Sequence, residues 1–433
     1  MQRGFAAVVS LIFLSGFFFG CASTRVLTPT ESYLCGRYDD AYKSFEGDVK
    51  TANPEEDGDY VLKNYYLASA ALMSGDYDTL EESARSAMKV AKSNLGETEG
   101  MASMAVRESI RIYKGEPYEK AMAGYYAGLS AYYKGDYEAA VVYLKNSLLF
   151  DKGSEEGHRD DFAATLYLLA KCYQKLGMTD EYLILTDKVA KLSPGAAEML
   201  RNSAKNNILV FVELGQIGQK RPDRYVAAYD EFYPIPSIEN HCILYANDKE
   251  IGTSADLLDL NHQGETRGVA AGKAASQTAK GAASFAAGLI PVVGNLAKAT
   301  VHATIAAQDF RQWFLLPKKI AVFEGRLEPG HHTLVVKFFG AGAQELKRFE
   351  QVHYYIPIIE GKETVLYLRG SENRHNAYTA KKTESGIKDK LDIPFQCNTY
   401  PADPQASFDK FMLSTIMTWN PSSDTPGQFV DRD

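Results

Sequence analysis

The sequence predicts a multidomain α+β protein: an N-terminal solenoid of paired helices, then a small antiparallel β-sandwich interrupted by a Gly/Ala-rich helical hairpin. Three observations predict this class. Helix pairs surround glycine turns in the first half, alternating strand patterns fill the second half, and a charge-free run of small residues separates two strand regions. At 433 residues the chain is long enough for two or three domains with cores of their own.

The clearest helix pair runs from Tyr118 to Asp151, with a tight turn at 134–136. Small residues recur on its first helix at spacings of three and four, so they share one face. Apolar residues form a matching stripe on the second helix. This pattern resembles the tetratricopeptide (TPR) helix pair, whose small, turn, aromatic, small and large positions correspond to Gly128, Gly135, Tyr137, Ala140 and Leu144.

Similar turns recur at uneven spacing, so we expect a degenerate array that ends with a capping helix over Ala196–Leu214. The turn glycines are Gly36, Gly75, Gly135 and Gly177. Each pair cannot bury its own apolar face, so neighbouring pairs stack into a curved surface. We expect a protein or peptide partner to bind the concave face, through contacts from Tyr125, Tyr126, Tyr132, Tyr133, Tyr167 and Tyr173.

The N-terminus has the composition of an export signal. Arg3 gives the positive start, and the apolar run Phe5–Phe19 is too short for an ordinary anchor helix. The run ends at Gly20-Cys21, which resembles a bacterial lipoprotein cleavage site; the alternative is an ordinary signal peptide cleaved near Ala22. Lipid on Cys21 would hold the mature N-terminus on a membrane. By resemblance to enterobacterial sorting, alanine after the cysteine favours the outer membrane, facing the periplasm or the surface.

The other cysteines have no zinc-site spacing, because none forms a C-x-x-C pair. An exported chain meets an oxidising compartment, in which disulfides form. Cys242 and Cys397 both lie in the C-terminal half and are candidates for a disulfide. Cys172 lies on a helix face rich in Leu and Ala, where we expect a buried free thiol.

Strand patterns begin after an aromatic, proline-punctuated seam near residue 230. Their short spacing and tight turns predict an antiparallel sandwich. The expected strands are His241–Ala246, Ile320–Leu327, Thr333–Phe339, Val352–Ile359 and Glu363–Leu368. Beyond Gly370 we expect an irregular tail with one helix over Phe408–Trp419.

The Gly/Ala-rich stretch, Gly264–Gln308, interrupts these strands. Its core, Gly281–Ala297, carries no charge and is broken by Pro291 and Gly294, so we expect a bent helical hairpin. Small residues at every fourth position permit close helix contact in lipid or in water. Three alternatives stay open: packing on the protein's own helices, a self-association surface, or insertion into a membrane.

Two stretches resemble a largely uncharacterised family of bacterial TPR envelope lipoproteins. They are Gly115–Ala140 and Asp309–Val336, the second with Asp309, Arg311, Trp313, Leu316, Pro317, Pro329 and Gly330 at matching positions. The resemblance implies an envelope lipoprotein and brings no catalytic residues. For Asp309, Arg311 and Trp313 we expect a salt bridge and a packed indole that join hairpin to sheet; the alternative is a binding role for these residues.

No linear motif indicates catalysis or cofactor binding. The sequence lacks G-x-S-x-G, a phosphate-binding loop and H-E-x-x-H, so we expect no enzyme activity, metal or cofactor. A hydrolase would instead need acidic or histidine side chains clustered in a pocket. The net charge of −8, without a basic stripe, argues against nucleic acid as a partner.

These observations favour a lipid-anchored envelope scaffold that binds a protein or peptide through its repeats. The alternative is an oligomeric membrane-associated assembly, a pore or secretion accessory, built through the hairpin. The expected segments are a signal peptide (1–20), a tether (21–35), the TPR-like repeats (36–220), a linker with the first strands (221–263), the hairpin (264–312), the β-sandwich (313–370) and the tail (371–433).

Overall fold

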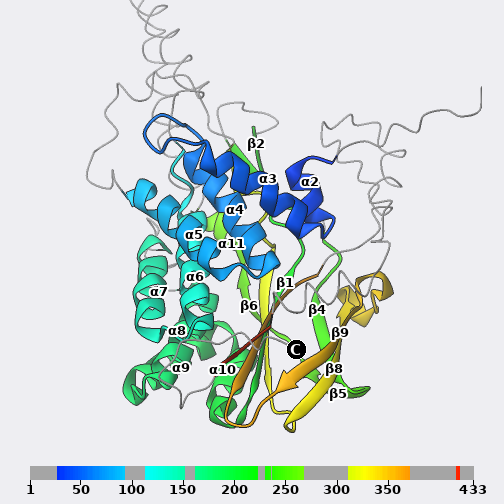
Figure 1. Cartoon of the computed structure of the whole chain (residues 1–433). Helices are drawn as coiled ribbons and strands as arrows, with labels where there is room; N and C mark the ends of the chain where they lie inside the picture. The colour runs from blue at the N-terminus through cyan, green and yellow to red at the C-terminus, as the bar shows by residue number, and fades with distance from the viewer. Residues whose placement is uncertain are drawn as a thin grey trace, which may run out of the picture.

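The computed structural model describes residues 27–92, 113–151, 161–222, 230–235, 237–267, 311–370 and 416–419. Its first half is helical, and successive helices pack side by side (Figure 1). The helices are α2 (Pro29–Leu34), α3 (Tyr38–Lys50), α4 (Tyr60–Ser74), α5 (Tyr77–Lys92), α6 (Pro117–Tyr133), α7 (Tyr137–Asp151), α8 (Ala163–Lys175), α9 (Thr179–Leu192), α10 (Pro194–Asn202) and α11 (Leu260–Arg267).

The predicted helix pairs α4–α5, α6–α7 and α8–α9 are confirmed, and each turns at a glycine. Gly75, Gly135 and Gly177 have φ of 72°, 76° and 71°, a left-handed conformation that glycine adopts at little cost. At the central turn the N–H of Asp136 donates to the carbonyl of Ala131 at 2.9 Å. This bond satisfies a carbonyl at the helix end and fixes the direction of the next helix.

The small face of α6 allows α7 to approach closely. A Cβ added to Gly124 would lie 2.8 Å from the backbone of Ser147, and one added to Gly128 would lie 2.6 Å from the Leu144 side chain. Both distances are shorter than those that Cβ atoms keep from other heavy atoms in proteins. The expected nesting of small residues against large ones is confirmed for this pair.

We expect Gly124→Ala to destabilise the protein by up to about 2 kcal/mol. Overpacking costs about 1–3 kcal/mol, and the better helix propensity of alanine returns about 1 kcal/mol. The matched control is Gly47→Ala on α3, where an added Cβ meets nothing within 4 Å. The free energy of unfolding of that variant should rise by about 0.5–1 kcal/mol. Urea unfolding of both variants measures whether each one is stabilised or destabilised. Equal changes in the free energy of unfolding would contradict the close approach of α7 to α6.

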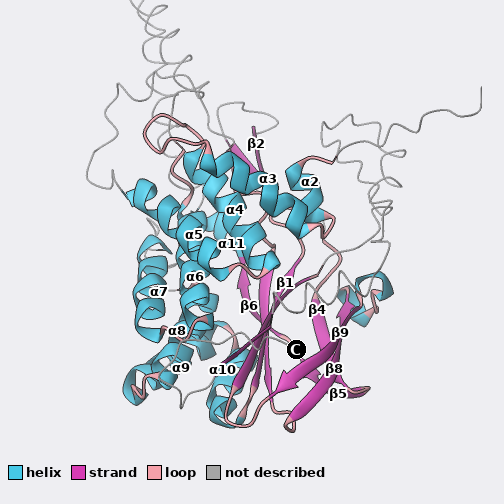
Figure 2. Cartoon of the chain, viewed as in Figure 1, coloured by secondary structure: helices cyan, strands magenta, loops and turns pink. Residues whose placement is uncertain are grey.

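Two sheets form a sandwich behind the helices (Figure 2). One is five-stranded in the order β11-β10-β1-β7-β6, and the other is four-stranded in the order β5-β4-β8-β9. A separate two-stranded ribbon joins β2 and β3. The strands are β1 (Ile208–Leu214), β2 (Gln219–Pro222), β3 (Asp230–Tyr233), β4 (His241–Ala246), β5 (Lys249–Thr253), β6 (Ala255–Asp259), β7 (Lys319–Gly325), β8 (Gly330–Phe339), β9 (Gln351–Ile358), β10 (Glu363–Arg369) and β11 (Ile416–Trp419).

The five-stranded sheet is buried on both faces. On β1, Leu209 and Phe211 belong to the core shared with the helices, whereas Val210 and Val212 belong to the core between the two sheets. Successive side chains of a strand point to opposite faces, so one strand serves both cores. The molecule therefore has three layers: helices, the five-stranded sheet and the four-stranded sheet.

Several predicted elements are wrong. The expected capping helix 196–214 ends at Asn202, and its apolar end forms β1, which pairs in parallel with β10 and antiparallel to β7. A continuous apolar run cannot be distinguished from a buried helix by periodicity alone. The sandwich is consequently not purely antiparallel, and β1 lies inside the predicted repeat segment. In the tail, 416–419 is a strand, not the end of a helix.

Candidate functional site

The tyrosines predicted to contact a partner lie inside the molecule. All six of Tyr125, Tyr126, Tyr132, Tyr133, Tyr167 and Tyr173 are buried. Phe211 of β1 lies edge-on to Tyr125 and Tyr167, with ring centroids 6.5 and 6.2 Å apart. The concave face of the helices is thus covered by the chain's own sheet (Figure 1). The prediction of partner contacts at these residues is wrong for this conformation, because their side chains already pack inside the chain.

Arg369, at the end of β10, centres one buried polar network between helices and sheet. Its guanidinium donates to the Glu213 carboxylate and, at 2.9 Å, to the carbonyl of Leu315. The same carboxylate accepts from the hydroxyls of Tyr126, at 2.7 Å, and Tyr367, at 2.9 Å. Burial opposes the charge of Arg369, but the surrounding oxygens hold its pKa above the ordinary value. The network ties α6 to β1 and β10.

Lys171 of α8 centres a second buried network. Its ammonium lies 2.7 Å from the Glu324 carboxylate and 2.8 Å from that of Glu363. Glu363 also accepts from the Tyr132 hydroxyl at 2.6 Å and pairs with Lys175 at 3.2 Å. Burial alone would raise the pKa of Glu363, but the two ammonium groups outweigh it and lower the pKa to about 2. This network ties α6 and α8 to β7 and β10.

Trp313 lies within the helical groove. Its indole stacks on Tyr65 with centroids 4.3 Å apart and planes 11° apart, and it meets Tyr126 edge-on at 5.4 Å. The indole N–H donates to Ser69 at 2.8 Å, and the backbone N–H donates to the Glu119 carboxylate at 2.6 Å. The segment before β7 therefore sits where a solenoid would hold a bound peptide.

The predicted junction of Asp309, Arg311 and Trp313 requires a correction. Arg311 pairs with Asp59 at 2.8 Å and donates to the carbonyl of Gly58 at 3.0 Å, just before α4. Asp309 lies outside the described residues. The salt bridge and the packed indole thus join this segment to the repeat helices, not the hairpin to the sheet. The indole packs on Tyr65 and Tyr126 in the groove, and the guanidinium pairs with Asp59 at the start of α4.

Sequence analysis did not single out the buried charges Lys171, Glu213, Glu363 and Arg369. Glu213 interrupts the apolar run of β1, and Arg369 ends the apolar run of β10. Charged side chains are almost never fully buried unless they are paired. A lone charge within an apolar strand is the signal that could have found these networks.

The cysteines differ from the expected pairing. Cys242 is buried and free, so the predicted Cys242–Cys397 disulfide is wrong; Cys397 lies outside the described residues. Cys172 is buried and free, as expected. Cys35, which sequence analysis left unassigned, is disulfide-bonded. The lipidation candidate Cys21 and the hairpin core Gly281–Ala297 lie outside the described ranges.

An open cleft of about 1020 Å³ lies beneath α10, between the last helices and the mouth of the sandwich. We call it the α10 cleft. It is bounded by α10, the start of β4, the corner between β5 and β6, and the end of β7. Its residues come from segments far apart in the sequence, so no linear motif predicts it.

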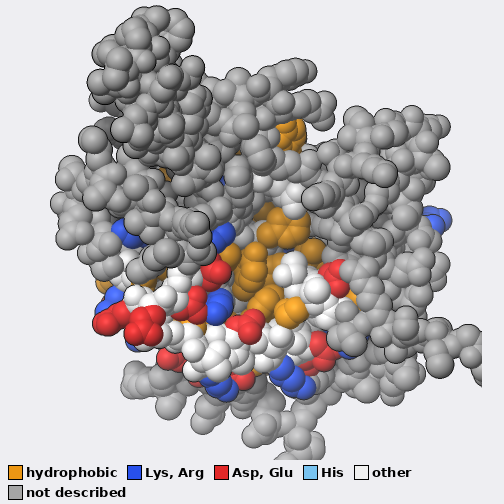
Figure 3. Space-filling model, turned by 90° about the horizontal axis from the view of Figure 1, so that it is seen from above, with side chains coloured by type: hydrophobic (Ala, Val, Ile, Leu, Met, Phe, Trp, Pro, Cys, Tyr) orange, Lys and Arg blue, Asp and Glu red, His pale blue; other side chains and the backbone are white. Residues whose placement is uncertain are grey.

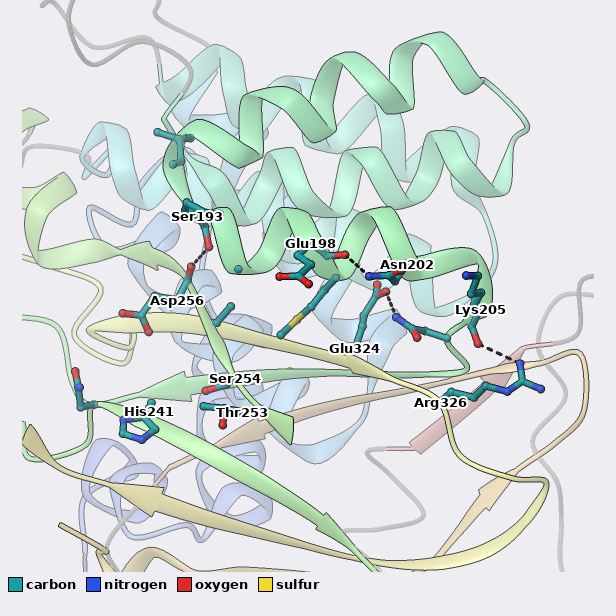
Figure 4. A pocket seen from close by; sticks show the side chains of 17 residues that line it. Ser193, Glu198, Asn202, Lys205, His241, Thr253, Ser254, Asp256, Glu324 and Arg326 are labelled. Carbon is teal, nitrogen blue, oxygen red and sulfur yellow. Dashed lines mark hydrogen bonds between the residues drawn. The ribbon is translucent and has the colours of Figure 1, made fainter. Parts of the chain in front are cut away.

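The α10 cleft is polar at its ends. Lys205 and Arg326 lie together at one end, and Asp256 lies at the other with Ser193 (Figure 4). Arg326 donates to the carbonyl of Lys205 at 3.1 Å. Neither cation forms an ion pair with a carboxylate within the described ranges. Between the ends lie Glu198, Glu324 and Asn202 (Figure 4). The lining also includes Met199, Asn206 and Asn240.

The hydroxyl groups of Ser193 and Ser254 form hydrogen bonds within the fold. Ser193 donates to the carbonyl of Asp256, and Ser254 accepts from the N–H of Cys242 at 3.1 Å. The ring of His241 stacks on Phe339 at a centroid distance of 5.3 Å. No bond among the described residues joins this histidine to a serine in the arrangement of a nucleophile and its base. Ser193, Ser254 and His241 are thus each engaged in a contact within the fold.

Other functional features are limited within the described part of the chain. No group of three or more His, Cys, Asp or Glu side chains there is placed to hold a metal ion. No described helix is both long and apolar enough to cross a bilayer. On the face seen from above, acidic and basic side chains are interspersed around an apolar strip (Figure 3).

Comparison with solved structures finds distant likenesses. A thermophilic TPR protein of Thermus thermophilus is similar over 40% of this chain and 92% of its own, at 20% identity and a TM-score of 0.20. A likeness of this size carries no inference about function. No family model matches the chain. No curated protein matches it significantly.

Proposed function

We propose that this protein is a non-catalytic scaffold of the bacterial cell envelope, anchored through lipid on Cys21, that binds a peptide segment of a protein partner in the α10 cleft. The filled concave face supports this choice. Trp313 and the buried networks occupy the surface where a solenoid would bind its partner. A partner that leaves the fold intact has to use an outer surface, and the α10 cleft is a hollow on that surface with convergent polar groups.

The side chains of the cleft suit a peptide. An asparagine amide both donates and accepts, so one side chain can bond the C=O and the N–H of a peptide unit. Asn202 and Asn240 are exposed, and Asn206 is half-buried. Met199 is half-buried beside them and supplies a pliable apolar contact. Peptide sites combine such backbone bonds with apolar side-chain contacts.

The charges at its ends would orient the peptide. Lys205 and Arg326 are exposed, and a guanidinium can bind a carboxylate through two parallel bonds. We therefore assign this end to an acidic side chain or a C-terminal carboxylate. Asp256 at the far end favours a basic or neutral residue, although Lys319 pairs with it at 2.8 Å.

Selection from a display library of short random peptides with free C-termini tests this assignment. The mature chain should enrich peptides that end in, or contain, acidic residues. The variant Lys205→Glu/Arg326→Glu should bind them at least about tenfold more weakly, because charge-assisted bonds are worth about 1.5–3 kcal/mol each. It should instead favour basic peptides.

The matched control is Lys89→Glu, an exposed lysine on α5 far along the chain from the cleft. It carries the same kind of charge change and should leave the affinity unaltered. Absence of any enriched peptide, or equal affinity of the cleft variant and the wild type, would refute binding at this site.

The envelope location rests on separate support. The N-terminal signal ends at Cys21, and the disulfide at Cys35 suits an oxidising compartment. Fractionation of cells provides the test: the wild-type chain should partition with outer membranes, and Cys21→Ser should leave them. Wild-type chain in the cytoplasmic fraction would contradict the anchor without bearing on the peptide site.

A further inference from the structure

The helix face that lines the α10 cleft carries both signs of charge. Its apolar residues, such as Ala197 and Leu200, belong to the helical core. The side that lines the cleft carries Glu198, Asn202 and Lys205, all exposed, at spacings of four and then three residues. Lys205 ends a 3₁₀ turn that follows α10 directly. A spacing of four in an α-helix and of three in a 3₁₀ turn keeps side chains on one face. This wall of the cleft therefore presents an acid, an amide and a base in chain order.

Glu198 lies between the two ends of the cleft (Figure 4). Its backbone carbonyl accepts from the Asn202 side chain at 3.1 Å, as the next turn of the helix allows. Within the described part of the chain, its carboxylate forms no ion pair. A bound cation can therefore reach it without breaking a contact of the fold.

The other two carboxylates of the lining are already paired. Asp256 pairs with Lys319 at 2.8 Å, and Glu324 pairs with the buried Lys171 at 2.7 Å. The network around Lys171 has two carboxylates and two ammonium groups, so it adds no net charge beneath the cleft. The ring of His241, which also lines the cleft, stacks on an aromatic ring of β8. Glu198 is thus the acidic side chain of the lining that is best placed for a ligand cation.

The spacing between the acid and the base matches a short stretch of extended peptide. From Glu198 to Lys205 the chain advances four residues of α-helix and three of 3₁₀-helix, about 12 Å along the axis. An extended peptide advances about 3.3 Å per residue, so the same length holds about three to four residues. A peptide whose carboxylate is held by Lys205 and Arg326 would place the side chain three or four residues earlier beside Glu198.

We propose that Glu198 selects peptides with a lysine or arginine three or four residues before the carboxylate that Lys205 and Arg326 bind. This inference rests on the proposed function of the α10 cleft and adds a second requirement to it. The warrant is charge complementarity: a cation at that position pairs with Glu198, whereas an acidic side chain there is repelled. Asn202, between the two charged positions, can bond the intervening peptide unit.

Fluorescence anisotropy with labelled synthetic peptides and the mature chain tests this selection. The first probe, Gly-Ser-Arg-Ala-Ser-Ala with a free C-terminus, has arginine three residues before its last residue. Further probes replace that arginine by alanine or glutamate, or move it next to the last residue. A parallel set that ends in an amidated glutamate presents the carboxylate on a side chain, and whichever set binds should show the same preference.

The wild type should bind the arginine probe up to about fivefold more tightly than the alanine probe, the size of an exposed ion pair. It should bind the glutamate probe most weakly, and the displaced arginine should give no gain. Glu198→Gln should remove the difference between arginine and alanine, and Glu198→Lys should make glutamate the preferred residue. The matched control is Glu82→Lys, an exposed glutamate on α5, which should keep the wild-type order.

The outcomes separate this inference from the function on which it rests. If no probe binds the wild type, or if Lys205→Glu/Arg326→Glu binds the probes as tightly, the peptide site itself is refuted. If the wild type binds all probes equally while Lys205→Glu/Arg326→Glu binds none of them, the peptide site stands and selection by Glu198 is wrong.

Discussion

Replacing Lys171 by methionine is expected to lower the free energy of unfolding by about 3–5 kcal/mol, because removal of one partner leaves buried charge uncompensated. Lys171 is fully buried and lies 2.7 and 2.8 Å from the carboxylates of Glu324 and Glu363. Methionine fills much of the same volume, so the loss reports the charge and not a cavity. Urea unfolding at neutral pH measures it.

The loss should shrink in acid. The Glu363 pKa is about 2 in the folded protein, below its ordinary value of 4.5. A carboxyl with a lowered folded pKa contributes stability that is present above the unfolded value and is lost as the pH falls through the folded one. The wild type therefore loses stability from about pH 4.5 toward pH 2. In the variant, the pKa of Glu363 is no longer lowered by Lys171, so this carboxyl protonates more readily and the two stability curves should converge over that range.

Lys191→Met is the control for this prediction, because Lys191 is an exposed lysine on α9. A surface substitution of this kind changes the free energy of unfolding by less than about 0.5 kcal/mol. If Lys171→Met lost no more than this control at neutral pH, the buried network would not hold the helices on the sheet.

Replacing Trp313 by alanine is expected to destabilise the protein by about 3–5 kcal/mol, the usual cost of removing a buried aromatic side chain. The indole is fully buried, stacks on Tyr65 and donates to Ser69. Its removal also leaves the Ser69 hydroxyl without that donor inside the groove. Denaturant midpoints give the size of the effect.

Two further variants test whether the effect comes from the packing of the Trp313 ring or from any change in this segment. Trp313→Phe keeps the stacking on Tyr65 and should recover part of the loss. Phe314→Ala changes the next residue, which is only half-buried, and should cost less than Trp313→Ala. An alanine effect at Trp313 no larger than that at Phe314 would show that the segment lies loosely on the groove.

The helix pairs could be predicted because their determinants are local. A left-handed glycine at Gly135 and small residues at Gly124 and Gly128 act within a few turns of helix. The turn between β4 and β5 is encoded as locally, by Asn247 and Asp248 with positive φ, although only β4 is among the expected strands. Such signals are complete within a short window of sequence.

The occupant of the groove could not be predicted in this way. Ile208 pairs with Thr364, and Trp313 meets Tyr65, so the decisive contacts join distant parts of the chain. An aromatic concave face suits a foreign peptide and an intramolecular strand equally well, because both supply apolar surface and hydrogen bonds. The α10 cleft escaped prediction for the same reason, since its lining is assembled from separate segments.

The central place of β1 bears on how the chain reaches its native state. This strand follows the helices directly, but its two neighbours end much later, β7 at Gly325 and β10 at Arg369. Contacts of such wide sequence separation slow folding. A nascent or truncated chain that stops before Trp313 leaves the aromatic groove partly unfilled, and one that stops before β10 leaves an edge of β1 unpaired. Both exposed surfaces promote aggregation. We therefore expect folding of this chain to benefit from a chaperone that shields these surfaces until the last strands are synthesised.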